Sequence, residues 1–461
     1  MKSSSSSAAL LLVAAGFGSC RSADMSLVHR AYYAGDHDRA LERLEEYERR
    51  DPRNQNRWDL EKSIVHIAAG DLDLAQQSLS SVKASLAESG SADRSAGEAP
   101  GRLARAAESL LVDDTALQFK IRDYEQQLVY ALLAAIAASR DSADAQAYSL
   151  QGLERALEIQ GEFVDDTATL FADIDEFRDA NGDNPKQAYR LVGFGDFVRA
   201  SLLEDSPTRM DEAERAYVRA FQLSPDYPHV EQDLARVRGE TRSEPGTGAL
   251  YVLTLTGRGP ILDEKIIDHP AESVLLIVKQ VWSYERGQTT FPIVTGIRIP
   301  ELRFATDNPK NVHVAIDGEP AGVTGTLTDI ERTAEIEFEA MHDTIVARAV
   351  LRRAVKLVAG EVAKSQLERT YHSHYYFLPD FLVDLGVALW SSAEQADLRS
   401  WSLLPARLQA LRIELPPGEH TIQLRAGNQA DQAAGRTIER RVRIHAGYNT
   451  YVIAAVPTIT E

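Results

Sequence analysis

Apolar residues recur at helical spacing through the first half of the chain and at strand spacing through much of the second half. From about residue 24 to residue 239, Ala, Leu, Glu and Arg dominate and β-branched runs are scarce, which favours helices. A polar linker at 239–248 contains Pro and Gly and separates the two patterns. The patterning therefore predicts a helical domain at 20–240, followed by an α+β domain with antiparallel strands at 249–457.

Three stretches of the helical half share one spacing of small and large apolar residues. Gly35-Asp36 and Gly70-Asp71 precede the first two, and their separation is close to the period of tetratricopeptide repeats, about 34 residues. In such a helical hairpin Gly-Asp forms the turn, the small Ala lets the two helices approach, and Pro ends the unit. We therefore expect tetratricopeptide-like helical repeats; an irregular helical bundle is the alternative. The aligned residues are Ala40, Leu44, Tyr47 and Pro52, then Ala75, Leu79, Val82 and Ala87, and finally Ala213, Tyr217, Ala220 and Pro225.

Elsewhere in the helical half the pattern is less regular. Residues 84–102 are rich in Ser, Gly and Ala and predict a flexible insertion. Helices are expected at 128–138 and 150–159, and a further helix is expected to run through Tyr189 and Phe197.

The second half alternates between strand and helix signals. Residues 333–364 predict one long amphipathic helix, because apolar side chains recur near one stripe, and residues 377–389 predict a shorter helix. Asp317-Gly318 marks a tight turn after an alternating run. The last four predicted strands indicate a small antiparallel sandwich or sheet. Strands are predicted at 250–255, 273–282, 293–299, 312–316, 408–415, 420–424, 437–445 and 450–456.

The first twenty residues are typical of an exported lipoprotein. Lys2 is followed by a Ser run and by an apolar stretch at 8–18, which is shorter than the roughly 20 residues needed to span a membrane. The stretch therefore predicts a signal peptide at 1–19. The run at 17–19 (Phe-Gly-Ser) resembles a lipobox, although that pattern prefers Leu where Phe stands. Cys20 is then the predicted lipidation site; the alternative is an ordinary secreted protein that is cut nearby.

Cysteine usage and charge narrow the chemistry. Cys20 is the only Cys in 461 residues, so an internal disulfide is excluded, and a lipid on Cys20 would leave no thiol for catalysis. The formal net charge of −19 argues against a nucleic-acid partner and against broad binding to anionic headgroups. Because two or more acyl chains on one residue give a stable anchor, we expect attachment to the membrane to rest on the lipid.

Short motifs are spread over most of the chain. They are Asn184-Pro185-x-x-x-Tyr189, residues 213–220, Gly257-x-Gly259-x-x-x-x-x-Lys265, Arg352-Arg353-Ala354-x-Lys356 and Asp397-x-Arg399-x-Trp401-x-x-Leu404-Pro405. Together they resemble an uncharacterised family of bacterial lipoproteins with a tetratricopeptide-repeat-like first half. The resemblance implies a membrane-associated lipoprotein with no established reaction. Arg21 follows Cys20, where Asp would favour retention in the inner membrane. In a bacterium with two membranes we therefore expect the periplasmic face of the outer membrane.

A histidine pair and a glycine pair contain parts of known ligand motifs. His372 and His374 would share one face of a strand, but a zinc site needs at least three protein ligands, and the spacing indicates no third. Gly257-x-Gly259-Pro260 follows a predicted strand but lacks the rest of the dinucleotide fingerprint, and Pro260 suits a turn. P-loop, nucleophile-elbow and HExxH motifs do not occur. The sequence therefore predicts no metal site, no cofactor and no catalytic residue.

Acidic residues around two tryptophans offer a hydrolase alternative. A pair of acids beside aromatic platforms could cleave glycans, although solvation of a helix surface also explains such acids. We expect Asp397 and Arg399 instead to form a local ion pair that fixes the loop before Trp401. The acids are Asp380, Asp384, Glu394 and Asp397, and the tryptophans are Trp390 and Trp401.

The repeats and the anchor favour a lipid-anchored scaffold or adaptor that binds a protein or peptide partner in the cell envelope. The repeat array would offer a concave surface to that partner, and the α+β half would dock a second partner or pack on the array. The alternatives are a cell-wall or glycan hydrolase that uses the acids near Trp390 and Trp401, and a structural subunit of an envelope assembly.

Overall fold

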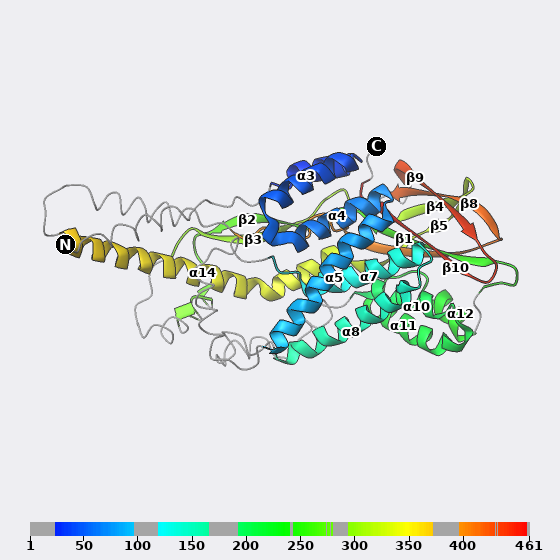
Figure 1. The fold of residues 1–461 in the computed structure, drawn as a ribbon, viewed down its shortest axis with the longest axis horizontal. Helices are drawn as coiled ribbons and strands as arrows, with labels where there is room; N and C mark the ends of the chain where they lie inside the picture. Colours follow the sequence, from blue (N-terminus) through cyan, green and yellow to red (C-terminus); the bar gives the residue numbers. More distant parts are fainter. Residues whose placement is uncertain are drawn as a thin grey trace, which may run out of the picture.

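The computed structural model describes residues 24–95, 119–165, 192–239, 243–272, 274–276, 278–279, 294–371, 396–428, 430 and 432–458. It has a helical N-terminal half and a C-terminal region with antiparallel strands, as the sequence predicts (Figure 1). The predicted signal peptide and Cys20 lie outside the described residues.

Helices of the N-terminal half pack in consecutive pairs. α2 packs on α3, α4 on α5, α7 on α8, and α10 on α11, and neighbouring pairs contact one another; α12 packs on α11. Two short 3-10 helices, η1 and η5, precede α4 and α11. The bounds are α2 (Ser26–Tyr33), α3 (His37–Arg50), η1 (Pro52–Asn54), α4 (Gln55–Ala69), α5 (Leu72–Ser95), α7 (Asp123–Ser139), α8 (Asp144–Asp165), α10 (Gly193–Leu203), η5 (Pro207–Arg209), α11 (Met210–Leu223) and α12 (Val230–Arg238).

The two Gly-Asp pairs form the turns inside the first two helix pairs. Gly35 (φ 76°) lies between α2 and α3, and Gly70 (φ 90°) ends α4; both angles are in the left-handed region that favours glycine. Asp36 caps α3, because its carboxylate accepts a hydrogen bond from Arg39 N at 3.2 Å. The turns predicted from these pairs are confirmed.

The spacing shared by the three repeat-like stretches marks buried positions. Every aligned residue within 40–47, 75–82 and 213–220 is buried. The flexible insertion predicted at 84–102 is wrong for its first part, because α5 continues as a helix to Ser95 and Leu86 packs from this extension onto the core.

Strands form two sheets and a ribbon. One sheet has the order β10-β1-β7-β6, the other has the order β5-β4-β8-β9, and β2 pairs with β3. The pairings are antiparallel except that of β1 with β10. The bounds are β1 (Gly248–Thr256), β2 (Ile261–Ile267), β3 (Ile297–Arg303), β4 (Val312–Ile316), β5 (Glu319–Val323), β6 (Gly325–Asp329), β7 (Arg407–Leu415), β8 (Gly418–Gly427), β9 (Ala433–Ile444) and β10 (Asn449–Val456).

The two sheets form a sandwich whose edges are joined by the chain. Leu250 and Val252 of β1 share one apolar core with Val314 of β4 and Leu424 of β8. Only Thr324 separates β5 from β6, and a short turn separates β9 from β10, so the chain passes from one sheet to the other at both sides. These crossings protect the sheet edges from pairing with other chains.

Helices cover the other face of the β10-β1-β7-β6 sheet, which gives three layers (Figure 1). Tyr251 and Leu253 of β1 point away from the sandwich and join the same core as the helices. α4 and α7 pack against β10, and α10 packs against β6. α7 is buried along most of its length, because neighbouring helices and the sheet both cover it.

An arm projects from the sandwich. It contains the β2–β3 ribbon and α14 (Ile330–Tyr371), whose 42 residues span about 63 Å at 1.5 Å per residue. Figure 1 shows α14 running away from the two sheets. Ile297 of β3 and Val350 of α14 lie in a small core of their own, together with Val274 and Val278.

One strand prediction is wrong and another is displaced. Within the predicted strand at 273–282, the described residues are helical. Val274 and Val278 lie one helical turn apart and face the same small core, which is the spacing of a helix that buries one side. β3 begins at Ile297 rather than at 293, after Gly296, whose φ is 65°.

The remaining predicted strands are confirmed, but β2, β5 and β6 were not predicted. β2 has charged residues at its centre, and β5 carries Pro320 and Gly322, which are depleted from strands except at sheet edges. α14 contains the helix predicted at 333–364 and is longer at both ends, whereas the helix predicted at 377–389 lies outside the described residues. Among the described residues, no helix combines the length and the apolar character that crossing a membrane requires.

Candidate functional site

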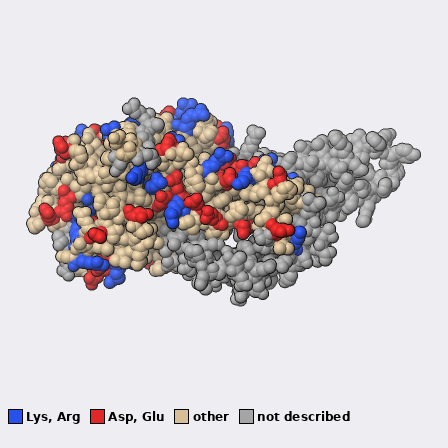
Figure 2. All heavy atoms as spheres, turned by 180° about the vertical axis from the view of Figure 1, so that it is seen from behind, with Lys and Arg blue, Asp and Glu red and all other residues tan. Residues whose placement is uncertain are grey.

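Many charged side chains at the surface pair locally. Figure 2 shows acidic and basic side chains interspersed over the described part of one face. Lys265 lies 2.6 Å from Glu301, and Arg443 lies 3.2 Å from Glu419. Exposed pairs of this kind contribute about 0–1 kcal/mol each. Charges buried between the helices and the sandwich are therefore more informative about how the molecule works.

Glu61 of α4 holds a loop from the far end of the sequence. We call residues 396–406 the seam loop, because they lie between the helical layer and the sandwich. The Glu61 carboxylate accepts hydrogen bonds from Ser402 N (2.8 Å), Ser402 Oγ (2.8 Å) and Leu403 N (2.9 Å). Glu61 is fully buried, and this burial raises its pKa, while Arg57 one turn earlier on α4 opposes the effect.

Glu125 and Asn54 bind the preceding residues of the seam loop. Glu125 of α7 is 1 % exposed and accepts a hydrogen bond from the backbone of Trp401; its burial raises its pKa. Asn54 Oδ1 accepts a hydrogen bond from Arg399 Nη1 at 3.2 Å. The seam loop is therefore bound by polar side chains from two successive helix pairs and the turn before α4.

The ion pair expected between Asp397 and Arg399 is confirmed. Arg399 Nε and Nη2 donate to the two oxygens of Asp397, each at 2.8 Å, which is the bidentate geometry that arginine favours. The Trp401 side chain is 1 % exposed and belongs to the main core. Asp397 and Trp401 thus hold the loop, and neither offers a free acid or an open platform for a sugar.

A serine and a histidine meet at Glu61, but not in the order of a catalytic triad. Ser402 Oγ donates to Glu61, and His29 Nε2 lies 2.8 Å from Ser402 Oγ, so the imidazole donates its proton to the hydroxyl. Burial, Arg57 and Arg258 lower the pKa of His29 to about 4, which keeps it neutral at pH 7. In a triad the histidine stands between serine and acid. Here the serine stands between them, and the arrangement fixes the loop.

A second buried carboxylate joins α10, α11 and α12 to the sheet. Glu204 follows α10 and is fully buried. It accepts hydrogen bonds from Tyr217 Oη at 3.0 Å, from Arg236 Nη1 at 2.5 Å and from the hydroxyl of Tyr251 on β1. Burial and the Glu204 charge raise the pKa of both tyrosines well above its usual value, so they remain donors. This network fixes the last helices to the sandwich.

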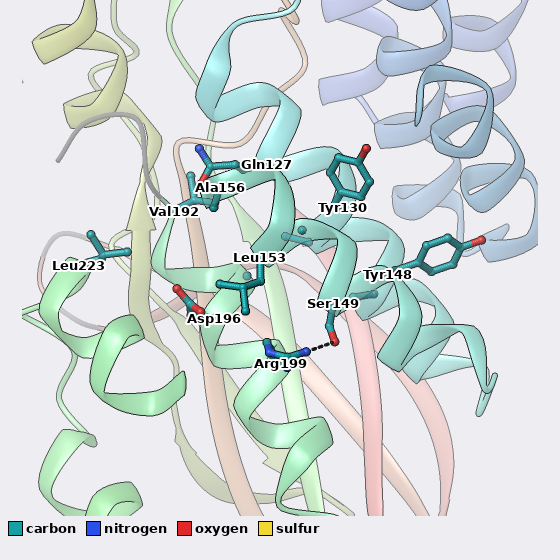
Figure 3. Close-up of a pocket in the computed structure, with 14 residues that line it drawn as sticks. Gln127, Tyr130, Tyr148, Ser149, Leu153, Ala156, Val192, Asp196, Arg199 and Leu223 are labelled. Atoms are coloured by element: carbon teal, nitrogen blue, oxygen red, sulfur yellow. Dashed lines mark hydrogen bonds between the residues drawn. The ribbon is translucent and has the colours of Figure 1, made fainter. Parts of the chain in front are cut away.

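A small cleft opens between α7, α8 and α10 (Figure 3). Its volume is about 40 Å³. Glycines let α8 and α10 lie close to α7 beside it: a Cβ at Gly152 would lie 3.1 Å from the Tyr130 Cβ, and a Cβ at Gly195 would lie 3.4 Å from the Ala131 Cβ. The lining residues are Gln127, Tyr130, Ala131, Ala134, Tyr148, Ser149, Gly152, Leu153, Ala156, Val192, Gly195, Asp196, Arg199 and Leu223.

Two of the cleft's polar residues are charged. Asp196 pairs with Arg219, whose Nη2 lies 2.9 Å from Asp196 Oδ1. Arg199 Nη1 donates a long hydrogen bond of 3.4 Å to Ser149 Oγ, shown as the dashed line in Figure 3. The cleft therefore combines an apolar wall with one neutralised pair and one guanidinium.

The glycine pair at 257–259 serves packing. Gly257 has φ 77°, and a Cβ at Gly259 would come within 2.5 Å of Leu404 O, to which Gly259 N donates a hydrogen bond at 2.8 Å. The strand β2 follows, and not a helix whose N-terminus could hold a phosphate. Pro260 lies in the irregular connection between β1 and β2, where no turn is assigned.

The remaining candidates from the sequence lie outside the described residues. These are Cys20, His372, His374, Asp380, Asp384, Trp390 and Glu394. Within the described ranges, no group of three or more His, Cys, Asp or Glu side chains is placed to hold a metal ion.

Sequence reasoning missed Glu61, Glu125 and Glu204. Each is an acid inside a helix or at its end, next to positions that are mostly buried, and this local conflict is the one signal the sequence offers. Comparisons with family models, with curated proteins and with solved structures find no match for the chain.

Proposed function

We propose that this protein is a lipid-anchored, non-catalytic scaffold or adaptor of the bacterial cell envelope. The observation that carries the proposal is that its buried acids join parts of the fold as hydrogen-bond acceptors. Glu61, Glu125 and Glu204 each accept hydrogen bonds that tie the helical layer to the seam loop or the sheet. Reacting acids need access to a substrate, whereas these three are between 0 % and 1 % exposed. The protein holds its parts in fixed positions, as a scaffold must.

The helix pairs are further proposed to be repeats of the tetratricopeptide type. Support comes from the shared spacing, from its complete burial and from the Gly-Asp turns of the first two pairs. α4, α7 and α10 pack against the sheet, so the chain's own sandwich covers this side of the helices. The partner surface we propose is the opposite side, which includes α5 and α8.

Exposed leucines on that side support this choice. Leu74 of α5 is 46 % exposed, and Leu150 and Leu157 of α8 are 45 % and 58 % exposed. Leu150 and Leu157 lie two helical turns apart and share one face of α8. Clustered apolar side chains on a soluble surface are typical of sites that bind protein.

Affinity capture of the full chain from detergent-solubilised membranes tests the proposal. A scaffold should bring down a partner in fixed stoichiometry, and Leu150→Asp with Leu157→Asp should abolish that recovery. Leu276→Asp is the matched control, because Leu276 is 56 % exposed but lies on the arm. Recovery of no reproducible partner, or equal loss with the control, would contradict the proposal. Recovery in one large stable complex would favour a structural subunit over a transient adaptor.

A further inference from the structure

Three arginines gather beside the cleft, but only two of them have an acid at ion-pair distance. Arg209 pairs with Glu212 at 2.9 Å, and Arg219 pairs with Asp196 at 2.9 Å. Among the described residues, Arg199 makes no ion pair, and its single hydrogen bond is the long one to Ser149 Oγ. Arg199 is therefore the one of the three arginines without a carboxylate at ion-pair distance, while Asp196 and Glu212, which are paired with the other two, also attract its charge.

Without a bound anion, the surroundings of Arg199 are unfavourable for its positive charge. The side chain is half-buried, and burial together with the nearby charges of Arg209 and Arg219 lowers its pKa, while Glu212 and Asp196 oppose the shift. A guanidinium in such a place is stabilised when an anion accepts its N–H groups. Figure 3 shows Arg199 beside Ser149, with Asp196 and Leu153 close to it.

The size of the cleft selects the anion. A bound water molecule needs about 10–15 Å³ of cavity volume. A cleft of about 40 Å³ therefore has room for about three heavy atoms. A carboxylate has three heavy atoms and one negative charge. A phosphate group is larger, and its second charge would exceed the one positive charge that the three arginines keep after pairing with Asp196 and Glu212. The apolar wall formed by Ala131, Leu153 and Ala156 suits the methyl or methylene group next to a carboxylate.

We propose that the cleft between α7, α8 and α10 binds a carboxylate group, with the Arg199 guanidinium as its donor. The carboxylate belongs either to a small organic acid or to a peptide, at an acidic side chain or at the C-terminus. This inference does not depend on the proposed scaffold function. If a peptide supplies the group, the cleft also gives that partner one recognisable feature.

Methyl NMR of the full chain tests the site directly. Sodium acetate is titrated against sodium chloride at constant ionic strength, with alanine and leucine methyl groups labelled. The signals of Ala131, Ala156 and Leu153 should shift and saturate. Arg199→Gln should weaken binding about tenfold or more, since it removes the charged donor. The acetate affinity of Arg199→Lys should lie between those of the unaltered chain and of Arg199→Gln, because Lys keeps the charge and loses the planar fork.

The matched control is Arg215→Gln, which removes an equal charge from the exposed side of α11. Its acetate affinity should equal that of the unaltered chain. Thermal melting confirms that each variant is folded; if Arg199→Gln unfolds, Arg199→Lys provides the comparison. Equal shifts with chloride, tighter binding of phosphate than of acetate, or unchanged affinity in the Arg199 variants would overturn the proposal.

Two short peptides distinguish the sources of the carboxylate. One carries a free C-terminus and the other carries a C-terminal amide, and each is prepared with and without a Glu side chain. Binding of any carboxylate-bearing peptide at least about tenfold more tightly than acetate identifies a peptide source, because side-chain and backbone contacts then add to the shared group. Equal affinity for acetate and the peptides identifies a small organic acid. Binding of the peptide without any carboxylate would contradict the proposal.

Discussion

At the scale of single residues, Glu61 joins α4 to a loop from the far end of the sequence. No local sequence pattern predicts this contact. Its carboxylate receives three hydrogen bonds from residues 341 or 342 positions away. The cost of burying the charge opposes these bonds and is visible in the raised pKa of Glu61. Since two of the donors are backbone N–H groups of the buried residues Ser402 and Leu403, the bonds should outweigh that cost.

Glu61→Gln should therefore destabilise the protein by about 2 kcal/mol, because the amide can accept from only one of the two backbone donors with its oxygen. Urea unfolding followed by fluorescence measures the change. Glu42→Gln, at an exposed position of α3, should change the free energy of unfolding by less than about 0.5 kcal/mol. A Glu61 variant that is as stable as the unaltered chain would show that the carboxylate is a net cost.

His29 gives the seam loop a dependence on pH. Its pKa falls from 6.5 to about 4 on folding, because of burial and then the charges of Arg57 and Arg258, while Asp24 opposes the shift. Between these values the unfolded chain binds a proton that the folded chain does not. Stability from neutral His29 is thus complete above pH 6.5 and is lost as the pH falls through 4.

Comparison of the unaltered chain with His29→Asn isolates this effect. Between pH 7 and pH 4 the unaltered chain should lose up to about 3 kcal/mol relative to the variant. Urea unfolding at a series of pH values measures the difference. His342→Asn, at an exposed position of α14, serves as the control. Parallel stability curves for the unaltered chain and His29→Asn would contradict the assignment.

At the scale of elements, the arm is fixed to the sandwich by a polar joint. Asn308 Oδ1 accepts from Arg258 N at 2.7 Å, and Asn308 Nδ2 donates to Glu331 Oε1 at 2.9 Å. Arg407 on β7 lies 2.9 Å from the other oxygen of Glu331, at the start of α14. The joint thus connects the loop after β1, the loop before β4, β7 and α14. An arm held at this many points moves with the body.

Asn308→Ala should loosen the joint without disturbing the sandwich core. The amides of residues 258 and 330–334 should exchange with deuterium about tenfold faster, since each lost hydrogen bond lowers the cost of local opening. Exchange within β8 should stay unchanged. Gln423→Ala, on the exposed side of β8, is the control. Unchanged exchange at the start of α14 would show that the apolar contacts alone hold the arm.

The elements that the sequence predicts correctly are those with a strong local pattern. β1, β4 and the C-terminal strands alternate or form short apolar runs, and Asp317-Gly318 turns with φ 51° and 91°, which suits a hairpin. The apolar run around Val274 fits a strand or a helix equally well, and contact with α14 decides for the helix. β2 and β5 have little pattern of their own, because pairing with their neighbours stabilises them.

At the scale of the whole molecule, the sequence predicts local contacts of the candidate site and misses contacts between distant parts of the chain. Ser402 binds Glu61 and His29 from the other end of the chain, and no spacing in the sequence reports a contact of that length. The ion pair of Asp397 with Arg399 was predictable because the two residues are neighbours. The helices α4, α7 and α10 pack against the sheet, so a partner that binds the helices has to use their other surfaces. The predicted lipid attachment at Cys20 rests on the sequence alone.

Attachment through Cys20 predicts a clear result for the whole molecule. Cys20→Ala should leave the protein in the soluble fraction once its signal peptide is cleaved, because the lipid is the one strong membrane contact we expect. The net charge of −19 disfavours adsorption to anionic headgroups. Fractionation at low and high salt, with blotting, measures the distribution. Ser19→Ala keeps a small residue before the cysteine and should stay with the membrane. Retention of the Cys20 variant on membranes at high salt would mean that another part of the chain holds it there.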